Sequence, residues 1–165
     1  MDSELARGRV SKFYRLVALG SRAGVLVRHK KLGNIMWEYV GMARSEEGLK
    51  KAIEEIRALK KEFYEDVCVP GEQNQFNQEL EKALRLEDFF EIGELMARDA
   101  LNRNESSGGH FRVESQTEYG AANSDDANYM YVAAWEYKGE DQEPELHKEP
   151  LKYEFIEVKT RNYKE

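Results

Sequence analysis

Apolar residues recur at helical spacing through about the first hundred positions and predict a series of amphipathic helices. The i, i+3, i+4, i+7 pattern occupies residues 10–17, behind a capping serine at Ser3, and resumes over residues 32–40. Two longer helices follow, one from the cap Ser45 to about residue 67 and one over about residues 74–102. Long amphipathic helices with short connections favour an antiparallel bundle, because each apolar face must be buried against a neighbour.

The pattern changes to period two near the C-terminus. Residues 129–137 are aromatic and β-branched and predict a strand, and the alternating apolar positions from Leu151 predict a second strand that ends near residue 158. Residues 115–128 and the acidic residues 139–150 are expected to be connections. Two strands alone are marginal in water, so they need a surface to lie on. The predicted fold is mainly α, with a three-helix bundle over residues 1–110 and a small β-hairpin appendage over residues 111–165, packed on the bundle or on domains outside this chain.

Charge and cysteine content narrow the class of protein. The 165 residues carry 25 Lys and Arg against 32 Asp and Glu, a formal net charge of −7. This balance argues against nucleic acid or an anionic membrane surface as a direct partner. The single cysteine, Cys68, excludes an internal disulfide and favours a reducing compartment. No stretch approaches the roughly 20 apolar residues that a membrane-spanning helix needs, so no direct membrane insertion is expected.

The connection after the last predicted helix is polar and contains the adjacent glycines Gly108 and Gly109. Glycine after a helix is a common C-cap, so a plain helix stop is one interpretation. The other is an interface, because arginine supplies a fork of donors and glycine lets another chain approach closely. The candidate interface residues are Arg103, Glu105, Ser106, Gly108, His110 and Arg112.

Recognisable catalytic motifs are missing from this sequence. No Gly-x-Gly-x-x-Gly follows a strand, and no P-loop, Cys-x-x-Cys or His-x-x-x-His is present. A metal cluster of His110 with Glu105 and Glu114 is conceivable, but a hydrogen-bonded histidine is the better interpretation. Ser106 or Ser107 beside His110 lacks the orienting acid of a hydrolase. We therefore predict no catalytic, cofactor-binding or metal-binding residue in this chain, as for a binding module or a piece of a larger protein.

Residues 94–112 resemble the C-terminal region of succinate dehydrogenase and fumarate reductase flavoprotein subunits. That family carries Arg-x-Glu-Ser-x-Gly-x-His-x-Arg, which falls on the six candidate interface residues. The chain departs from the pattern at Ser107 and Gly109, where many members carry Ser-Arg-Gly-Ala-His, so no contact of that arginine is carried over. Further segments similar to the family are residues 32–37 (Leu-Gly-x-x-Met-Trp), 40–44 (Gly-Met-x-Arg), 125–128 (Asp-Asp-x-Asn), 147–151 (closing hairpin) and 161–163 (Arg-x-Tyr tail).

The resemblance implies a spectrin-repeat-like three-helix domain with a terminal β piece, in an FAD-dependent oxidoreductase of electron transport and the tricarboxylic acid cycle. It implies that FAD and the catalytic arginine lie in upstream flavin-binding and capping domains, so this chain alone would be an inactive fragment without a cofactor. The implied partners are those domains and the iron–sulfur subunit, with the assembly peripheral at the cytoplasmic face of the membrane through its other subunits. The alternatives are a self-standing helical interaction module and the equivalent domain of an L-aspartate oxidase, which shares a similar central motif.

Overall fold

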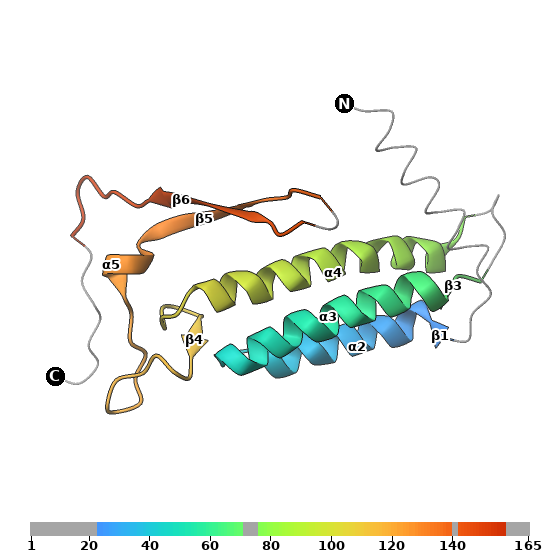
Figure 1. Ribbon diagram of the computed structural model, residues 1–165, viewed down its shortest axis with the longest axis horizontal. Coiled ribbons are helices and arrows are strands. Elements are labelled where there is room, and N and C mark those ends of the chain that lie inside the picture. Colours follow the sequence, from blue (N-terminus) through green and yellow to red (C-terminus); the bar gives the residue numbers. More distant parts are fainter. Residues whose placement is uncertain (1–22, 71–75, 140–141, 158–165) are drawn as a thin grey trace.

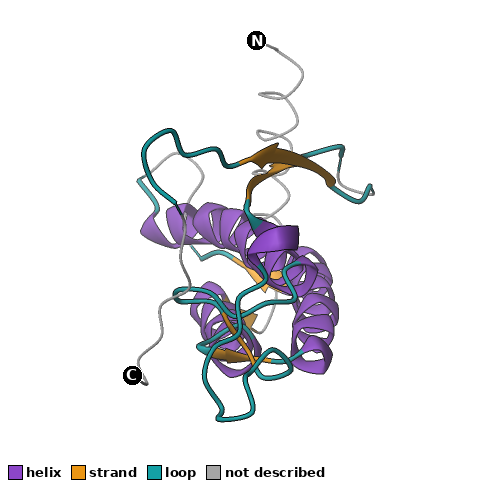
Figure 2. Ribbon diagram, turned by 90° about the vertical axis from the view of Figure 1, so that its left-hand side faces the viewer, coloured by secondary structure: helices purple, strands orange, loops and turns teal. Residues whose placement is uncertain are grey.

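The structure, a computed structural model, describes residues 23–70, 76–139 and 142–157. Three helices lie side by side as an antiparallel bundle (Figure 1), and a two-stranded hairpin lies along one side of it (Figure 2). The predicted fold class is confirmed, while the helix predicted over residues 10–17 and the tail at residues 161–163 lie outside the described residues. The bundle consists of α2 (Val25–Tyr39), α3 (Glu46–Asp66) and α4 (Gln78–Asn102), and the hairpin of β5 (Tyr131–Glu136) and β6 (Glu145–Pro150).

Side-chain caps fix where the two longer helices begin. Ser45 caps α3 as predicted, since its hydroxyl accepts a hydrogen bond of 3.0 Å from the Gly48 amide. Helix α4 begins at Gln78, four residues later than the predicted start at about residue 74, because the Asn77 side chain caps it there. Helix α2 begins at Val25, earlier than the pattern from residue 32 indicated, and has no side-chain cap.

The core fills the space between the three helices in two clusters. Phe63 of α3 and Phe90 of α4 meet edge to face with ring centroids 5.5 Å apart. Near Gly93 of α4 the helices approach closely, because a Cβ built there would lie only 3.2 Å from Sδ of Met36 on α2. The larger cluster contains Val25, Leu32, Ile56, Leu59, Phe63, Val67, Val69, Leu80, Ala83, Leu86 and Phe90, and the smaller one Val40, Leu49, Ala52, Ala97 and Ala100.

Short parallel strand pairs join the connections at both ends of the bundle. At one end β1 (Ala23–Gly24) pairs with β3 (Val67–Cys68). At the other, β2 (Ala43–Arg44) pairs with β4 (Phe111–Arg112), so that Arg44 lies opposite Arg112. The second pair places the α2–α3 connection against the residues that follow α4, which is where the candidate interface residues lie.

The hairpin forms, but the predicted position of its second strand was wrong. Strand β5 pairs with β6, residues that were expected to be a connection, and the alternating residues from Leu151 onward follow the strand instead. The register places Trp135 opposite Leu146, and both side chains are half-buried. The first strand also begins later than predicted, because Asp126–Tyr129 form the short helix α5. Within the described residues, none of the helices is long and apolar enough to cross a membrane.

Candidate interface at the end of helix α4

Arg112, in β4, closes the C-terminal end of α4. Its side chain is 1% exposed, and Nη1 donates to the carbonyl oxygens of Ala100 at 3.1 Å and Leu101 at 3.3 Å. The last carbonyls of a helix have no partner within the helix and carry its negative partial charge. A buried guanidinium at this position therefore satisfies both the hydrogen-bonding need and the electrostatics of the helix end.

The same arginine links the ends of two helices. Its Nε donates to the Glu114 carboxylate at 3.1 Å, and the other oxygen of Glu114 accepts from the Glu46 amide at 2.7 Å. Glu46 is the first residue of α3, where amides lack helical partners and a negative charge is favourable. One ion pair thus joins the negative end of α4 to the positive end of α3.

His110 bridges the end of α2 and the end of α4 as a neutral imidazole. Its Nε2 lies 2.8 Å from the Arg103 carbonyl oxygen, so this nitrogen carries the proton, and Nδ1 accepts from Arg44 Nη1 at 2.6 Å. Arg44 Nε in turn donates to the Val40 and Gly41 carbonyls at 3.1 and 2.9 Å. Burial lowers the pKa of His110, and the positive charge of Arg44 lowers it further.

Arg103 and Glu105 attach the following loop and strand β5. Arg103 donates to Glu105 at 2.7 Å and to the carbonyl oxygens of Tyr129 and Tyr131 at 3.2 Å each. Its guanidinium also lies over the two tyrosine rings, 5.7 and 5.3 Å from their centroids. The second oxygen of Glu105, which is buried, accepts from the Asp125 amide at 2.8 Å. The pair therefore holds the hairpin at the end of the bundle.

A tight turn projects from this buried network. The backbone of residues 107–110 is closed by two hydrogen bonds of 2.9 and 3.0 Å, with Gly108 at φ +58°. Beneath the turn, the Ser106 hydroxyl accepts from the Arg112 amide at 2.8 Å and lies 3.1 Å from its carbonyl. A Cβ built on Gly109 would meet nothing within 4 Å, so the turn faces open space.

The structure thus brings the six predicted residues together, but mostly as partners of one another and of this chain. Glu105, Ser106 and Arg112 are buried, whereas Gly108 is exposed. The conceivable metal cluster is not formed, since His110, Glu105 and Glu114 each have other partners. Sequence reasoning gave no role to Arg44 or Asp125, although both lie in segments that resemble the family. Arg44 contacts His110 across 66 residues of sequence, and Asp125 contacts Glu105 across 20. Patterns within a single helix or strand cannot predict contacts at such separations.

A groove of about 680 Å³ lies between the hairpin and helices α3 and α4. Trp135 of β5 lines it and donates its indole N–H to Asp99 at 2.9 Å. Its charged residues pair with one another: Arg57 binds Glu94 at 3.0 Å and Glu143 at 2.8 Å. The guanidinium groups of Arg57 and Arg98 hold the pKa of Glu143 below its ordinary value. The pairs of Glu143 with Arg57 and Arg98 attach the hairpin to the bundle.

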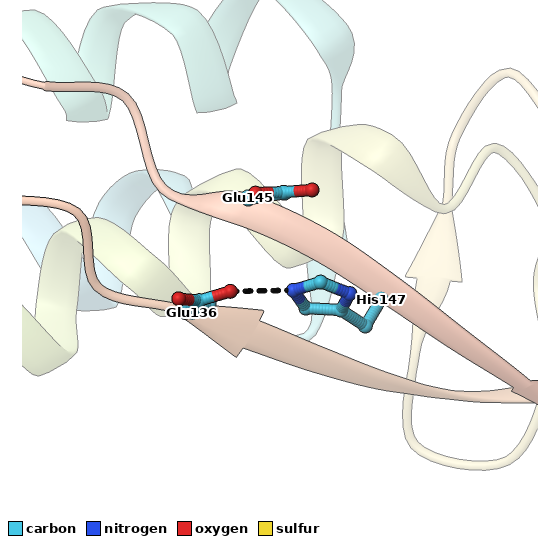
Figure 3. Close-up of side chains that lie close together, drawn as sticks. All are labelled: Glu136, Glu145 and His147. Atoms are coloured by element: carbon cyan, nitrogen blue, oxygen red, sulfur yellow. Dashed lines mark hydrogen bonds and ion pairs between the residues drawn. The ribbon is translucent and has the colours of Figure 1, made fainter.

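Glu136, Glu145 and His147 form a cluster on the outer face of the hairpin (Figure 3). Their potential ligand atoms lie within 4.8 Å of one another, and His147 Nε2 is 2.8 Å from the Glu136 carboxylate. The Lys138 ammonium, however, lies 3.0 Å from Glu136 and 2.6 Å from Glu145. Lys138 first, and then His147, lower the pKa of Glu136 by hydrogen bonding to its carboxylate. A lysine thus supplies the positive charge in this cluster, as in an ordinary cross-strand ion-pair network.

Residues 29–163 match the family described as the C-terminal domain of the fumarate reductase flavoprotein, and the chain belongs to that family. A fumarate reductase flavoprotein subunit from Proteus vulgaris is 31% identical over 100 residues, which are 61% of this chain and 16% of that protein. An uncharacterised FAD-dependent oxidoreductase from Methanocaldococcus jannaschii is 33% identical over 89 residues, 50% of this chain and 14% of that protein. L-Aspartate oxidases are also similar; the one from Vibrio cholerae is 28% identical over 92 residues, 54% of this chain and 16% of the oxidase.

Solved structures contain the same fold. A quinol–fumarate reductase solved with menaquinol molecules matches with a TM-score of 0.76 at 24% identity, over 92% of this chain and 25% of that chain. The chain therefore spans about a seventh of the length of the relatives it matches in sequence and about a quarter of the solved chain.

Proposed function

We propose that this chain is the C-terminal helical domain of a longer FAD-dependent flavoprotein subunit that interconverts succinate and fumarate. The observation that carries the proposal is the family match over residues 29–163, in a chain that spans only 16% of the Proteus vulgaris subunit. FAD and the reacting groups would lie upstream of this domain. The domain would support the flavin-binding and capping domains, contact the iron–sulfur subunit and be inactive alone.

The arrangement at the end of α4 supports a mechanical rather than a chemical role. The donors described for Arg103 and Arg112 are directed at carbonyls and carboxylates of this chain, and His110 is held neutral between an arginine and a carbonyl. Such a network makes the end of the bundle rigid. We expect the six candidate residues to serve an interface in which Gly108 and its exposed neighbours meet the partner while the buried side chains hold the turn in place.

The proposal extends to organisation and location. Residues 1–110 would act as the supporting bundle and residues 111–165 as an appendage, attached through the β2–β4 pair and the contacts of Arg103. The parent subunit would lie at the cytoplasmic face of the membrane and be held there by its partner subunits. The named solved relative is a quinol–fumarate reductase, which is consistent with such an assembly.

Of the two alternatives, the equivalent domain of an L-aspartate oxidase is favoured by the 28% identity to the Vibrio cholerae enzyme. Substrate oxidation by the complete polypeptide separates the two. The complete polypeptide that contains this chain is expressed and its flavin is measured by absorbance. Reduction of an artificial electron acceptor is then followed with succinate or L-aspartate. We expect bound flavin and succinate-dependent reduction. Oxidation of L-aspartate but not of succinate would establish the L-aspartate oxidase alternative.

The isolated chain provides the second half of the test. Added to free FAD and passed through a desalting column, it is expected to retain no flavin absorbance and to show no activity with either substrate. A stoichiometric flavin band on the isolated chain would contradict the proposal and favour a self-standing function.

A further inference from the structure

Residues 151–157 carry the sequence pattern of a strand but lie outside the strands of the structure. Leu151, Tyr153 and Phe155 alternate with Lys152 and Glu154, and aromatic residues at such spacing are typical of one face of a strand. The structure instead gives this segment bends at residues 154 and 155. It leaves β6 beyond the end of the helical bundle (Figure 1).

The apolar side chains of this segment are exposed. On the side that the alternation makes apolar, Leu151 is 37% exposed, Tyr153 is 51% exposed and Phe155 is 90% exposed. Single exposed apolar residues are ordinary, but several in succession mark a surface that another molecule or domain covers. The segment therefore offers an apolar face without a partner in the described chain.

The backbone of the segment is also unpaired. The Leu151 amide donates to the Met130 carbonyl at 3.1 Å, which extends the hairpin ladder by one step. Beyond it, residues 152–156 form no hydrogen bond with the rest of the described chain. A row of free amides and carbonyls next to an existing strand is a template for pairing with another strand.

We propose that residues 151–156 add as a strand to an open sheet edge in the upstream flavin-binding part of the same polypeptide. Leu151, Tyr153 and Phe155 would face apolar residues of that part, and Lys152 and Glu154 would face solvent. Main-chain hydrogen bonds would pair the added strand with the sheet edge. The alternate side chains would fix the register of that strand, as in other strand additions. The inference rests on the proposed function, because it needs the upstream polypeptide.

The upstream part is the partner that the comparisons favour. The family match continues to residue 163 and so includes the segment, while the chain covers 14–16% of its sequence relatives. A segment that belongs to the family domain is accompanied in those relatives by the rest of a much longer chain. A second copy of this chain is the competing occupant, and the experiment separates the two.

Hydrogen exchange measured by mass spectrometry tests the proposal on the complete flavoprotein and on the isolated chain. We expect the amides of residues 152–156 to exchange at least about tenfold more slowly in the complete protein, because exchange from a paired strand requires local opening. Equal, fast exchange in both would overturn the proposal. Equal protection in both would also overturn it, and concentration-dependent protection of the isolated chain would assign the segment to contact between copies.

Two substitutions in the complete protein sharpen the result. Tyr153→Pro removes the central amide and should return residues 152–156 to fast exchange, whereas Lys152→Ala on the solvent-facing side should leave them protected. Flavin content and succinate oxidation are measured on the same samples. Fast exchange of the segment in the unsubstituted polypeptide, when that polypeptide binds flavin and oxidises succinate, contradicts the strand addition alone. An unsubstituted polypeptide that neither binds flavin nor oxidises succinate contradicts the proposed function.

Discussion

Substituting alanine for Arg112 would remove the group that closes the end of α4. Four hydrogen bonds would be lost, three to the carbonyls of Ala100, Leu101 and Arg103 and one to Glu114. Because the arginine side chain is 1% exposed, water reaches the vacated carbonyls only by entering the space that the side chain leaves. The substitution therefore leaves the carbonyl oxygens at the end of α4 without hydrogen-bond donors, because water does not simply replace the guanidinium.

The expected cost follows from the geometry. A hydrogen bond to a charged group contributes about 1.5–3 kcal/mol. The three carbonyl bonds share the donor Nη1 and do not add in full. Glu114 is 39% exposed, so its ion pair is screened and contributes about 1 kcal/mol or less. We expect the free energy of unfolding of the isolated chain to fall by about 3 kcal/mol. For a domain of this size that corresponds to a melting temperature lower by about 6–12 °C.

Urea and thermal unfolding followed by far-ultraviolet circular dichroism measure this loss. Arg112→Lys keeps the charge but not the fork of donors and should fall between the native chain and Arg112→Ala. Arg85→Ala is the matched control, because Arg85 is 66% exposed on α4 and its loss should change stability by about 0.5 kcal/mol or less. A loss below about 1 kcal/mol for Arg112→Ala, with helix content retained, would refute the reasoning.

Three further predictions concern the same end of the bundle and the hairpin. Gly108→Ala should cost about 1–2 kcal/mol in unfolding free energy because φ is +58°, whereas Gly109→Ala, in open space and without a left-handed φ, should cost nothing measurable in the same urea titration. The pKa of His110 is lower in the folded chain than in the unfolded chain, where it is about 6.5. As the pH falls below about 6.5, the unfolded chain therefore binds the proton before the folded chain does, and the free energy of unfolding decreases. The stability that the neutral imidazole contributes is fully present above that pH. His110→Gln should flatten the pH dependence of stability between pH 7 and 5; an unchanged slope would contradict the neutral assignment. Trp135→Phe removes the 2.9 Å bond to Asp99 and should cost about 1–2 kcal/mol, with faster hydrogen exchange in β5 but not in the helices.

The sequence predicted the three helices of the described bundle, and the six candidate interface residues lie close together at the end of α4. Helix α3 was predicted closely because its cap at Ser45, its acidic first turn and its apolar stripe agree with one another. The start of α2 was missed because it has no capping side chain. The partners within the site were also missed, since the contact between Arg44 and His110 depends on β2 and β4 pairing across the bundle.

The hairpin shows why period-two reasoning placed a strand wrongly. Strand β6 is polar, with Leu146 half-buried and its neighbours exposed, so it lacks the alternation that a half-buried strand displays. Its position is set by pairing with β5 in the register that puts Trp135 opposite Leu146. The stronger alternation, from Leu151 to Phe155, has no strand beside it among the residues that the structure describes. The pattern of apolar residues indicates which side chains a segment can bury. Whether the segment forms a strand also depends on which strand lies next to it.

The two parallel strand pairs at opposite ends of the bundle also restrict how this domain can diverge. Helix α2 runs from β1 to β2, and both of these strands are bonded to partners at fixed registers. Inserting one residue into α2 would rotate everything after it by about 100° and shift it by about 1.5 Å. One pair would then have to break. Insertions and deletions should therefore accumulate in the loops, and the length of α2 should stay constant among homologues that retain both pairs.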